Sequence, residues 1–145
     1  MSHNDKPQAF IDTALSTLMQ QAKAYFDSHW RFVNICGSTV EGGVELLYSF
    51  SDGLMLENLR FIVDTQARVP SITGLFPAAF FFENEVHDLF GVTFSDISID
   101  FAGNFYKVSV PTPMNPQSVQ ARKAAGAAAQ ESGDPTTDET TQGGK

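Results

Sequence analysis

Residues 31–63 read RFVNICGSTVEGGVELLYSFSDGLMLENLRFIV, and this stretch predicts three consecutive β-strands. The first strand is expected at Arg31–Gly37 and the second at Val44–Phe50, with the turn Glu41-Gly42-Gly43 between them. Alternate side chains of the second strand are large and apolar, which places them on one face of a sheet: Val44, Leu46, Tyr48 and Phe50. The third strand is expected at Leu54–Val63. The stretch therefore predicts an antiparallel meander with one apolar face.

The connection to the third strand contains Asp52-Gly53, a two-residue turn in which glycine tolerates a positive φ. Within the third strand the alternation of apolar and polar residues slips near Asn58, which indicates a β-bulge there.

The segment ahead of the strands predicts a helix over Gln8–Ser28, and Asp5, Lys6 and Pro7 suit its start. Its apolar residues recur at three- and four-residue steps and share one face: Ile11, Ala14, Leu15, Leu18, Ala22, Tyr25 and Phe26. A meander with one apolar face needs a second layer. We therefore expect an α+β fold with the N-terminal helix packed on the antiparallel meander, and further strands of the sheet can come from elsewhere in the sequence.

A second helix is predicted at Ala78–Phe90, after a loop that contains Pro70 and Pro77 and before Gly91, a residue favoured at helix ends. At about 100° per residue, its apolar residues form a stripe suited to packing on the sheet. This stripe consists of Leu75, Ala79, Phe82, Val86, Leu89 and Phe90.

Phe80 and Phe81 fall outside this stripe, on faces that also carry acids and a histidine: Glu83, Glu85, His87 and Asp88. Aromatic rings beside a few charges are typical of a contact between subunits, where the rings are buried and the charges fix the register of the partner. We therefore predict a partner interface on this helix. The alternative is that the C-terminal part of the same protein covers Phe80 and Phe81.

Glu83 and His87 are four positions apart, so their spacing also permits a hydrogen-bonded acid–base pair. Glutamate and histidine at this spacing more often form a local ion pair or cap a neighbouring loop. No nucleophilic side chain or glycine-rich phosphate loop stands beside them to complete a reaction centre. We therefore predict no catalytic, cofactor-binding or metal-binding residue in this cluster.

Composition excludes several classes of protein. The net charge of -8, with nine Lys and Arg residues, disfavours nucleic-acid binding. Met1–Gln8 lacks the pattern of a signal peptide, and no stretch approaches the roughly 20 apolar residues of a membrane span. Cys36 is the only cysteine, which excludes an internal disulfide, a cysteine-ligated zinc site and a conventional iron–sulfur cluster. We expect Cys36 to be a buried strand residue of a protein in a reducing compartment.

The C-terminal part of the sequence changes character twice. Val92–Asn115 is rich in proline and aromatic residues, and predicts an extended arm laid over another surface or folded back over Phe80. From Gln117 to Lys145 large apolar residues are nearly absent, so little burial can offset the conformational entropy. We expect one domain over residues 1–116 and a disordered tail over residues 117–145, with at most a transient helix at Ala121–Gln130.

The stretch Pro70-Ser71-Ile72-Thr73, followed by Glu-Asn-Glu-Val-His-Asp-Leu-Phe-Gly-Val at residues 83–92, resembles the signature of the NADH dehydrogenase 30-kDa subunit family. The usual pattern of that family is Glu-Arg-Glu, two variable residues, an acid, an apolar residue and then Phe-Gly. Here five positions match it: Glu83, Glu85, Asp88, Phe90 and Gly91. The resemblance extends over Gln8–Pro116 and implies an α+β fold.

Two departures narrow the resemblance: Asn84 replaces the arginine, and the basic Pro-Leu-Arg-Lys-like stretch of respiratory members is absent. The protein is in these respects similar to the 30-kDa-like subunit of Ech-type energy-converting nickel–iron (NiFe) hydrogenases. That likeness implies a cofactor-free scaffold beside the hydrogenase large subunit. It also implies NiFe and iron–sulfur centres in partner subunits, ferredoxin-linked hydrogen chemistry coupled to ion movement, and a peripheral position on the cytoplasmic side of the membrane.

Carried over by position, Glu83, Glu85, Asp88, Phe90 and Gly91 are expected to secure the large subunit. Two alternatives remain open. The first is the 30-kDa subunit of a respiratory NADH:quinone oxidoreductase, and the second is an independent binding module or an acid–base enzyme that uses Glu83 and His87.

Overall fold

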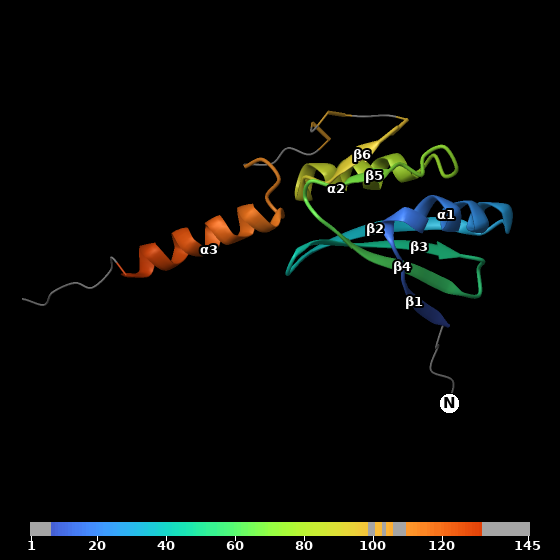
Figure 1. Cartoon of the computed structure of the whole chain (residues 1–145), viewed down its shortest axis with the longest axis horizontal. Helices are drawn as coiled ribbons and strands as arrows, with labels where there is room; N and C mark the ends of the chain where they lie inside the picture. The colour runs from blue at the N-terminus through green and yellow to red at the C-terminus, as the bar shows by residue number, and fades with distance from the viewer. Residues whose placement is uncertain (1–6, 99–100, 103, 106–109, 132–145) are drawn as a thin grey trace, which may run out of the picture.

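The structure is a computed structural model that describes residues 7–98, 101–102, 104–105 and 110–131 (Figure 1). Its elements in chain order are β1 (Gln8–Asp12), the 3-10 helix η1 (Leu15–Thr17), α1 (Leu18–Asp27), β2 (Arg31–Val40), β3 (Gly43–Ser51), β4 (Leu56–Val63), β5 (Arg68–Pro70), α2 (Ala79–Phe90), β6 (Thr93–Ser95) and α3 (Pro116–Glu131).

The main sheet has the strand order β1-β4-β3-β2. The pairs β2–β3 and β3–β4 are antiparallel, which confirms the predicted meander. Helices α1 and α2 lie on the same side of this sheet, so the predicted α+β class with two layers is confirmed (Figure 1). A short parallel pair, β5 and β6, lies beside α2.

The hydrophobic core fills the space between the sheet and the two helices. The four predicted inward-facing residues of β3 are fully buried, as are Leu18 and Ala22 of α1. From α2 the predicted stripe packs against the same core: Ala79, Val86 and Phe90 are buried, and Leu75, Phe82 and Leu89 are partly buried. Tyr25 of α1 stacks on Phe50 of β3 at a centroid distance of 4.3 Å.

The prediction of a helix over Gln8–Ser28 is wrong in its first half, because Gln8–Asp12 forms strand β1. This strand pairs in parallel with β4, so that Ile11 lies opposite Leu59. Arg60 Nε of β4 also lies 2.7 Å from the Asp12 carboxylate. Ile11 therefore reaches the core from a strand, and its helical spacing to Leu15 is coincidental. Backbone pairing with a strand more than forty residues away overrides the local pattern.

The predicted bulge at Asn58 is also misplaced. The register between β3 and β4 is continuous through Asn58, whereas the irregularity lies in β2 between Phe32 and Asn34. Asn58 is buried, where its amide joins three strands: Ser49 Oγ donates to its Oδ1 (2.6 Å), and its Nδ2 donates to the carbonyl of Ala9 (3.1 Å). A buried polar residue on the sheet interrupted the apolar alternation without interrupting the strand.

Cys36 is exposed, so the expectation that it is buried is wrong. Its neighbours Ile35 and Gly37 face the helices, where Ile35 belongs to the core and Gly37 lies beneath the ring of Phe90. Side chains alternate along a strand, so Cys36 points to the opposite face of the sheet. Strand β2 is at the edge of the sheet, and its residues on that face are only partly covered.

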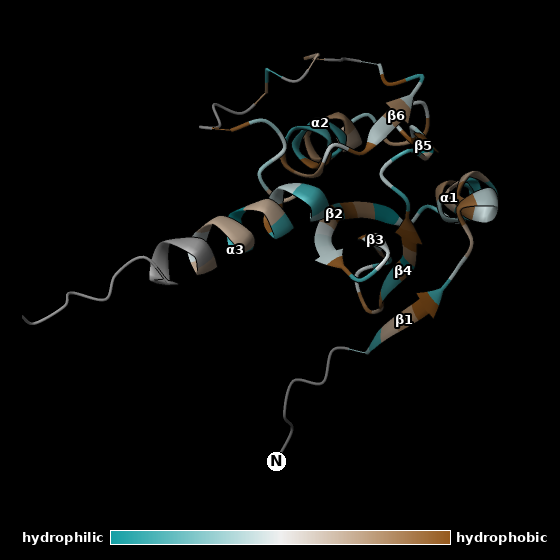
Figure 2. Ribbon diagram, turned by 60° about the vertical axis from the view of Figure 1, so that its left-hand side comes forward, coloured by the Kyte–Doolittle hydropathy of each residue, from teal (hydrophilic) through white to brown (hydrophobic). Residues whose placement is uncertain are grey.

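The C-terminal segment contains two elements, β6 and α3, whose bounds were not predicted from the sequence. Residues Thr93–Ser95 of the expected arm form β6, which pairs with β5. The backbone from Pro116 to Glu131 forms helix α3, which includes the stretch Ala121–Gln130 where a transient helix was expected within the tail. This helix projects away from the two layers (Figure 2). Residues 132–145 of the expected tail lie outside the described residues. No described helix is long and apolar enough to cross a membrane.

Candidate functional site

Glu83 is the central residue of the site, because its fully buried carboxylate joins α2 to the loop before it. Oε1 accepts a hydrogen bond from the backbone N–H of Ile72 (2.9 Å), and Oε2 accepts one from the hydroxyl of Ser71 (2.7 Å). These hydrogen bonds of Glu83 therefore come from within the same protein. We call Ser71, Ile72, Thr73 and Glu83 the Glu83 clamp.

The Glu83 clamp extends as a series of hydrogen bonds to the segment after β6. The backbone N–H of Ser98 donates to Thr73 Oγ1 (3.1 Å), and the hydroxyls of Thr73 and Ser71 lie 2.7 Å apart. Because Ser71 donates its proton to Glu83, the Thr73 hydroxyl is the donor between the two. All members except Ser98 are buried, and hydrogen bonds in series reinforce one another in a low-dielectric interior.

Burial raises the pKa of Glu83 from its usual 4.5 to about 7, while the hydrogen bonds from Ser71 and Ile72 pull it down. Desolvation is the largest cause, because burial penalises the charged form of the carboxyl group. The pKa of the buried Tyr48 hydroxyl is likewise raised, first by burial and then by the nearby Glu83 carboxylate. The site thus holds two groups that favour their neutral forms.

Asn84 is also buried, at 1% exposure. Its Nδ2 donates to the carbonyl of Phe80 (2.8 Å), and its Oδ1 accepts from the backbone N–H of Phe101 (3.0 Å). Asn84 therefore fastens the segment around Phe101 to the first turns of α2 with a neutral amide.

The C-terminal end of α2 is closed by three further contacts. Gly91 has a φ of +76°, and its N–H donates to the carbonyl of His87 (2.9 Å), which confirms the predicted helix end. His87 Nδ1 donates to the carbonyl of Val92 (2.9 Å). Asn115 Nδ2 donates to the carbonyl of Phe90 (2.9 Å), which satisfies one of the terminal carbonyls of the helix.

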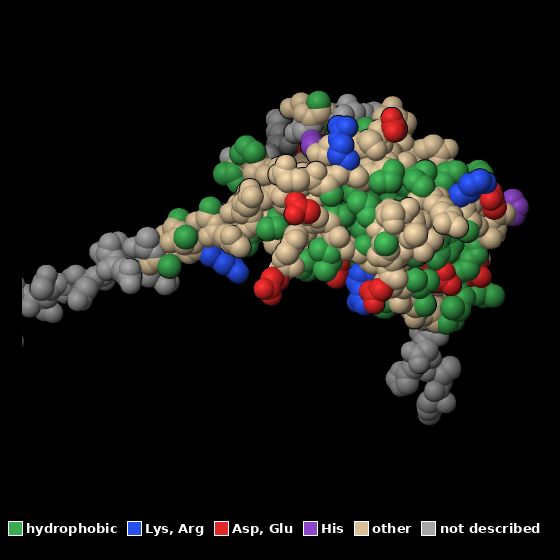
Figure 3. Space-filling model, in the orientation of Figure 1, with side chains coloured by type: hydrophobic (Ala, Val, Ile, Leu, Met, Phe, Trp, Pro, Cys, Tyr) green, Lys and Arg blue, Asp and Glu red, His purple; other side chains and the backbone are tan. Residues whose placement is uncertain are grey.

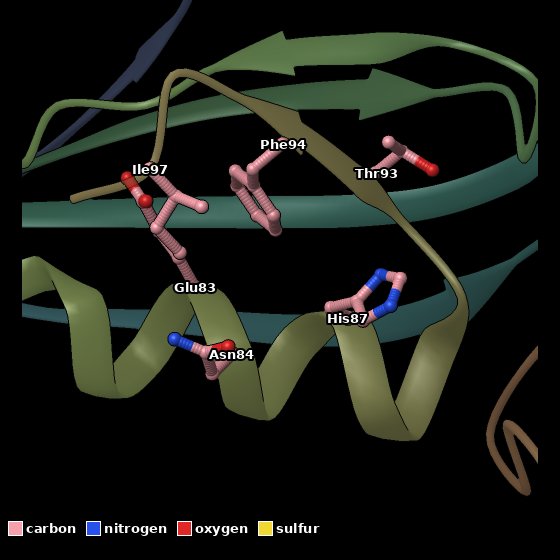
Figure 4. A pocket seen from close by; sticks show the side chains of 6 residues that line it. All are labelled: Glu83, Asn84, His87, Thr93, Phe94 and Ile97. Carbon is pink, nitrogen blue, oxygen red and sulfur yellow. The ribbon is translucent and has the colours of Figure 1, made fainter. Parts of the chain in front are cut away.

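Glu83 and His87 each bond a different loop and together line a cavity of about 40 Å³ with Asn84, Thr93, Phe94 and Ile97 (Figure 4). Figure 4 shows Glu83 and His87 on successive turns of α2, with Phe94 across the cavity. A space of this size accommodates a water molecule or two and is too small for an organic substrate. Within the described residues, no cluster of three or more His, Cys, Asp or Glu side chains is placed to hold a metal ion.

The predicted interface residues divide into two groups. Glu83, Asp88 and Phe90 are buried inside the protein, whereas Phe80, Phe81, Glu85, His87 and Gly91 keep part of their surface exposed. Phe81 is the most prominent, at 53% exposure. Its ring contacts Phe80 at 4.7 Å and Phe105 at 5.3 Å, and Phe105 in turn contacts Phe101 at 5.1 Å. We call Phe80, Phe81, Phe101 and Phe105 the aromatic cluster.

The sequence left open whether the C-terminal part of the same protein covers Phe80 and Phe81. Phe105 of that part does contact Phe81, but about half of the Phe81 side chain stays exposed. The sequence did not reveal that Ser71, Ile72 and Thr73 would be the partners of Glu83. A backbone N–H and two hydroxyl groups form no distinctive sequence pattern. The one sequence feature that linked these three residues to Glu83 was their place in the same family signature.

The sequence profile of the family described as "Respiratory-chain NADH dehydrogenase, 30 Kd subunit" matches residues 6–98, which include the Glu83 clamp. The protein belongs to this family. The profile spans β1 through β6, so membership in the 30 Kd subunit family accounts for both layers of the fold.

The C subunits of two NADH-quinone oxidoreductases are similar to this 30 Kd family member over a short stretch. The protein of Mesorhizobium japonicum is 54% identical over 37 residues, and that of Paramagnetospirillum magneticum is 47% identical over 38 residues. Each stretch is 26% of this protein and only 18% or 19% of the relative.

The fold is similar to that of a chain in the membrane-bound sulfane sulfur reductase (MBS), an archaeal respiratory membrane complex. The TM-score is 0.63 over 96% of this protein and 86% of that chain, with 18% sequence identity. At this identity the likeness concerns the fold.

Proposed function

We propose that this protein is a cofactor-free structural subunit of a membrane-bound, complex I-like respiratory complex, and specifically of an Ech-type NiFe hydrogenase. In this proposal it packs against the NiFe large subunit on the cytoplasmic side of the membrane and is held there by its partners. The NiFe and iron–sulfur centres of ferredoxin-linked hydrogen chemistry reside in those partner subunits.

The structural role is supported by what the signature residues do within the fold. Glu83 and His87 hold the loops on either side of α2, and the cavity between them suits water rather than a substrate. The exposed Phe81 ring offers the apolar surface of a contact with another subunit on the same helix. Fold likeness to a chain of an archaeal respiratory membrane complex is consistent with this role.

One observation carries the choice of a hydrogenase: Asn84, buried at 1% exposure, replaces the arginine of the usual family pattern. Its amide bonds Phe80 and Phe101, in a place where a guanidinium would bring a charge into the interior and would not supply the acceptor for the Phe101 N–H. This protein therefore uses the position to fasten its own segment around Phe101.

The second candidate is the 30-kDa subunit of an NADH:quinone oxidoreductase, which the 54% identity to the Mesorhizobium japonicum protein favours over its 37 matched residues. The missing basic stretch and Asn84 argue against it. The two candidates share the structural role and differ in the partners.

Affinity purification of the tagged full-length protein from native membranes distinguishes them. Mass spectrometry of the co-purified subunits is combined with an assay of viologen- or ferredoxin-dependent hydrogen evolution. Recovery of a NiFe large subunit with hydrogen activity is the expected result. Recovery of nicotinamide- and quinone-binding subunits would assign the protein to NADH:quinone oxidoreductase, and recovery of the protein alone would contradict both assignments.

A further inference from the structure

Within the part of the chain that the structure describes, no strand pairs with the outer edge of β2. This strand is the last of the order β1-β4-β3-β2, and among the described residues its backbone pairs with β3 alone. At the far end of the strand, the hydroxyl of Thr39 donates to the carbonyl of Met114. An unpaired edge offers a row of backbone N–H and C=O groups to a further strand.

Two grooves lie along this open edge, between β2 and the helical layer. The first, of about 390 Å³, is lined by Phe32 and Phe76 among others, and the second, of about 290 Å³, by Gly37, Phe90 and Met114 among others. Both are lined mainly by apolar side chains. Figure 3 shows hydrophobic side chains gathered over the middle of the folded body, with Lys, Arg, Asp and Glu side chains around them.

The β2 irregularity between Phe32 and Asn34 matters here because it places Phe32 and Ile35 on the same face of the sheet, three positions apart. The inward-facing residues of β2 are then Phe32, Ile35 and Gly37, which follow one another along the grooves. A strand added beside β2 would present alternate side chains to both grooves within five or six residues, at roughly 3.3 Å per residue.

The ends of the open edge differ in charge. Arg31 lines the first groove, whereas Glu85 lines the second and the exposed Glu41 follows the end of β2. An added strand therefore meets positive charge at the start of β2 and negative charge at its end, which fixes a preferred direction.

A second copy of this protein does not fit the edge. A Cβ atom placed on Gly37 would lie 2.6 Å from Cε2 of Phe90, so α2 lies directly above β2. Two copies joined through β2 would hold these strands about 4.8 Å apart. Their α2 helices would then be closer than the roughly 8–10 Å that packed helices require.

The segment before β1 and residues 132–145 do not suit the edge either. The segment before β1 leaves from the opposite edge of the sheet, where Leu56 N donates to the carbonyl of Pro7. Residues 132–145 contain no Val, Ile, Leu, Met or aromatic residue to fill the grooves.

We propose that the open edge of β2 binds an extended segment of a different protein, which adds a fifth strand to the sheet. This segment carries apolar side chains at alternate positions facing Phe32 and Gly37. It also has an acidic residue beside Arg31 and a basic residue beside Glu85. The inference does not depend on which respiratory complex contains the protein, because it rests on the edge, the grooves and their charges.

Hydrogen–deuterium exchange tests the added strand directly. The purified full-length protein and the membrane complex that contains it are compared at the same pH, and peptides covering Arg31–Ser38 are followed. In the complex, the outward-facing amides of β2 exchange at least about tenfold more slowly. Unchanged exchange at β2 in a complex that protects other parts of the protein would overturn the proposal.

The other occupants give distinct results. Protection of β2 in the purified protein that increases with concentration, together with a dimer mass, would show a second copy at the edge. Protection in the purified monomer at all concentrations would show that the protein covers its own edge. Either result overturns the proposal.

The variant Arg31→Glu tests the charge pattern, and Arg68→Glu on β5 is the matched control, since both arginines are exposed. Arg31→Glu is expected to lower recovery of the complex about tenfold and to remove the protection at β2, without changing the melting temperature of the purified protein. Arg68→Glu is expected to leave the protection at β2 intact. Equal effects of the two variants would count against a charge-directed strand.

Discussion

The Oε2 atom of Glu83 lies 2.7 Å from the hydroxyl oxygen of Ser71, and this contact binds helix α2 to the loop that precedes it. The same carboxylate receives the N–H of Ile72, so one buried side chain satisfies two donors of a loop that has no regular structure. A family signature residue therefore acts inside the fold, and the surface of α2 is left to its neighbours Phe81 and Glu85.

Removal of the Glu83 carboxyl group should destabilise the protein strongly. Glu83→Ala leaves the buried Ile72 N–H without its acceptor and removes the carboxylate that accepts from the Ser71 hydroxyl, at a cost of about 3 kcal/mol in the free energy of unfolding. Glu83→Gln is the matched control, because its amide oxygen still accepts a hydrogen bond, and it should remain within about 1 kcal/mol of the wild type. Urea denaturation of the full-length protein measures both. Equal losses would mean that the charge, and not the acceptor, holds the loop.

Stability should depend on pH through Glu83. Its folded-state pKa of about 7 is above the usual 4.5, so the folded protein holds a proton that the unfolded protein has released. The stabilisation is therefore fully present below pH 4.5 and is lost as the pH rises through about 7. The total change is on the order of 3 kcal/mol.

Denaturation of the wild type and of Glu83→Gln at a series of pH values checks this dependence. The wild type should lose stability between about pH 4.5 and 7, the range set by the unfolded and folded pKa values of Glu83, and the variant should not. Asp12 and Asp52 contribute in the opposite sense, since their lowered pKa values mean stability lost as the pH falls. A flat wild-type profile above pH 5 would contradict the raised pKa of Glu83.

Asn84→Arg restores the arginine of the usual family pattern and should be poorly tolerated in this protein. The substitution places a guanidinium at a position of 1% exposure and removes the acceptor for the Phe101 N–H. We expect a loss of about 3 kcal/mol in the free energy of unfolding. The control is Glu85→Arg at the adjacent, half-buried position, which should cost less than about 1 kcal/mol. If Asn84→Arg left the free energy of unfolding unchanged, Asn84 would no longer be a structural argument for a hydrogenase over an NADH:quinone oxidoreductase.

Phe81→Glu should disrupt assembly more than folding. The Phe81 ring is 53% exposed and contributes little to the core, so the free energy of unfolding should change by less than about 1 kcal/mol. Recovery of partner subunits should fall about tenfold or more if the ring is buried in the contact. Phe10→Glu is the matched control, because Phe10 is 55% exposed on β1, away from α2. Normal co-purification of Phe81→Glu would refute the interface on this helix.

The elements that sequence reasoning predicted well are those with a complete local pattern. Alternation along β3 and the turn at Gly42 specify the meander, because period-two burial and a positive φ are properties of consecutive residues. The stripe of α2 and its end at Gly91 are similarly local. The family signature could also be read directly, since it occupies one continuous segment.

The elements that it missed depend on a partner that is distant in the sequence. Gln8–Asp12 became a strand through pairing with β4, and the amide of Asn58 was accommodated by Ser49 and Ala9 from neighbouring strands. Cys36 was exposed because β2 is an edge strand, a fact that follows only from the strand order.

The sequence by itself determined the α+β class, the meander and the second helix with its glycine end, since these follow from local periodicity and backbone preference. Only the tertiary structure decided that Glu83 is an interior acceptor with a raised pKa and that Phe81 stays at the surface. Position on a helix fixes the direction in which a side chain points. Whether a side chain of α2 meets water or another segment depends on where the loops that contain Ser71 and Phe101 lie. The positions of these loops are set by contacts across the whole domain.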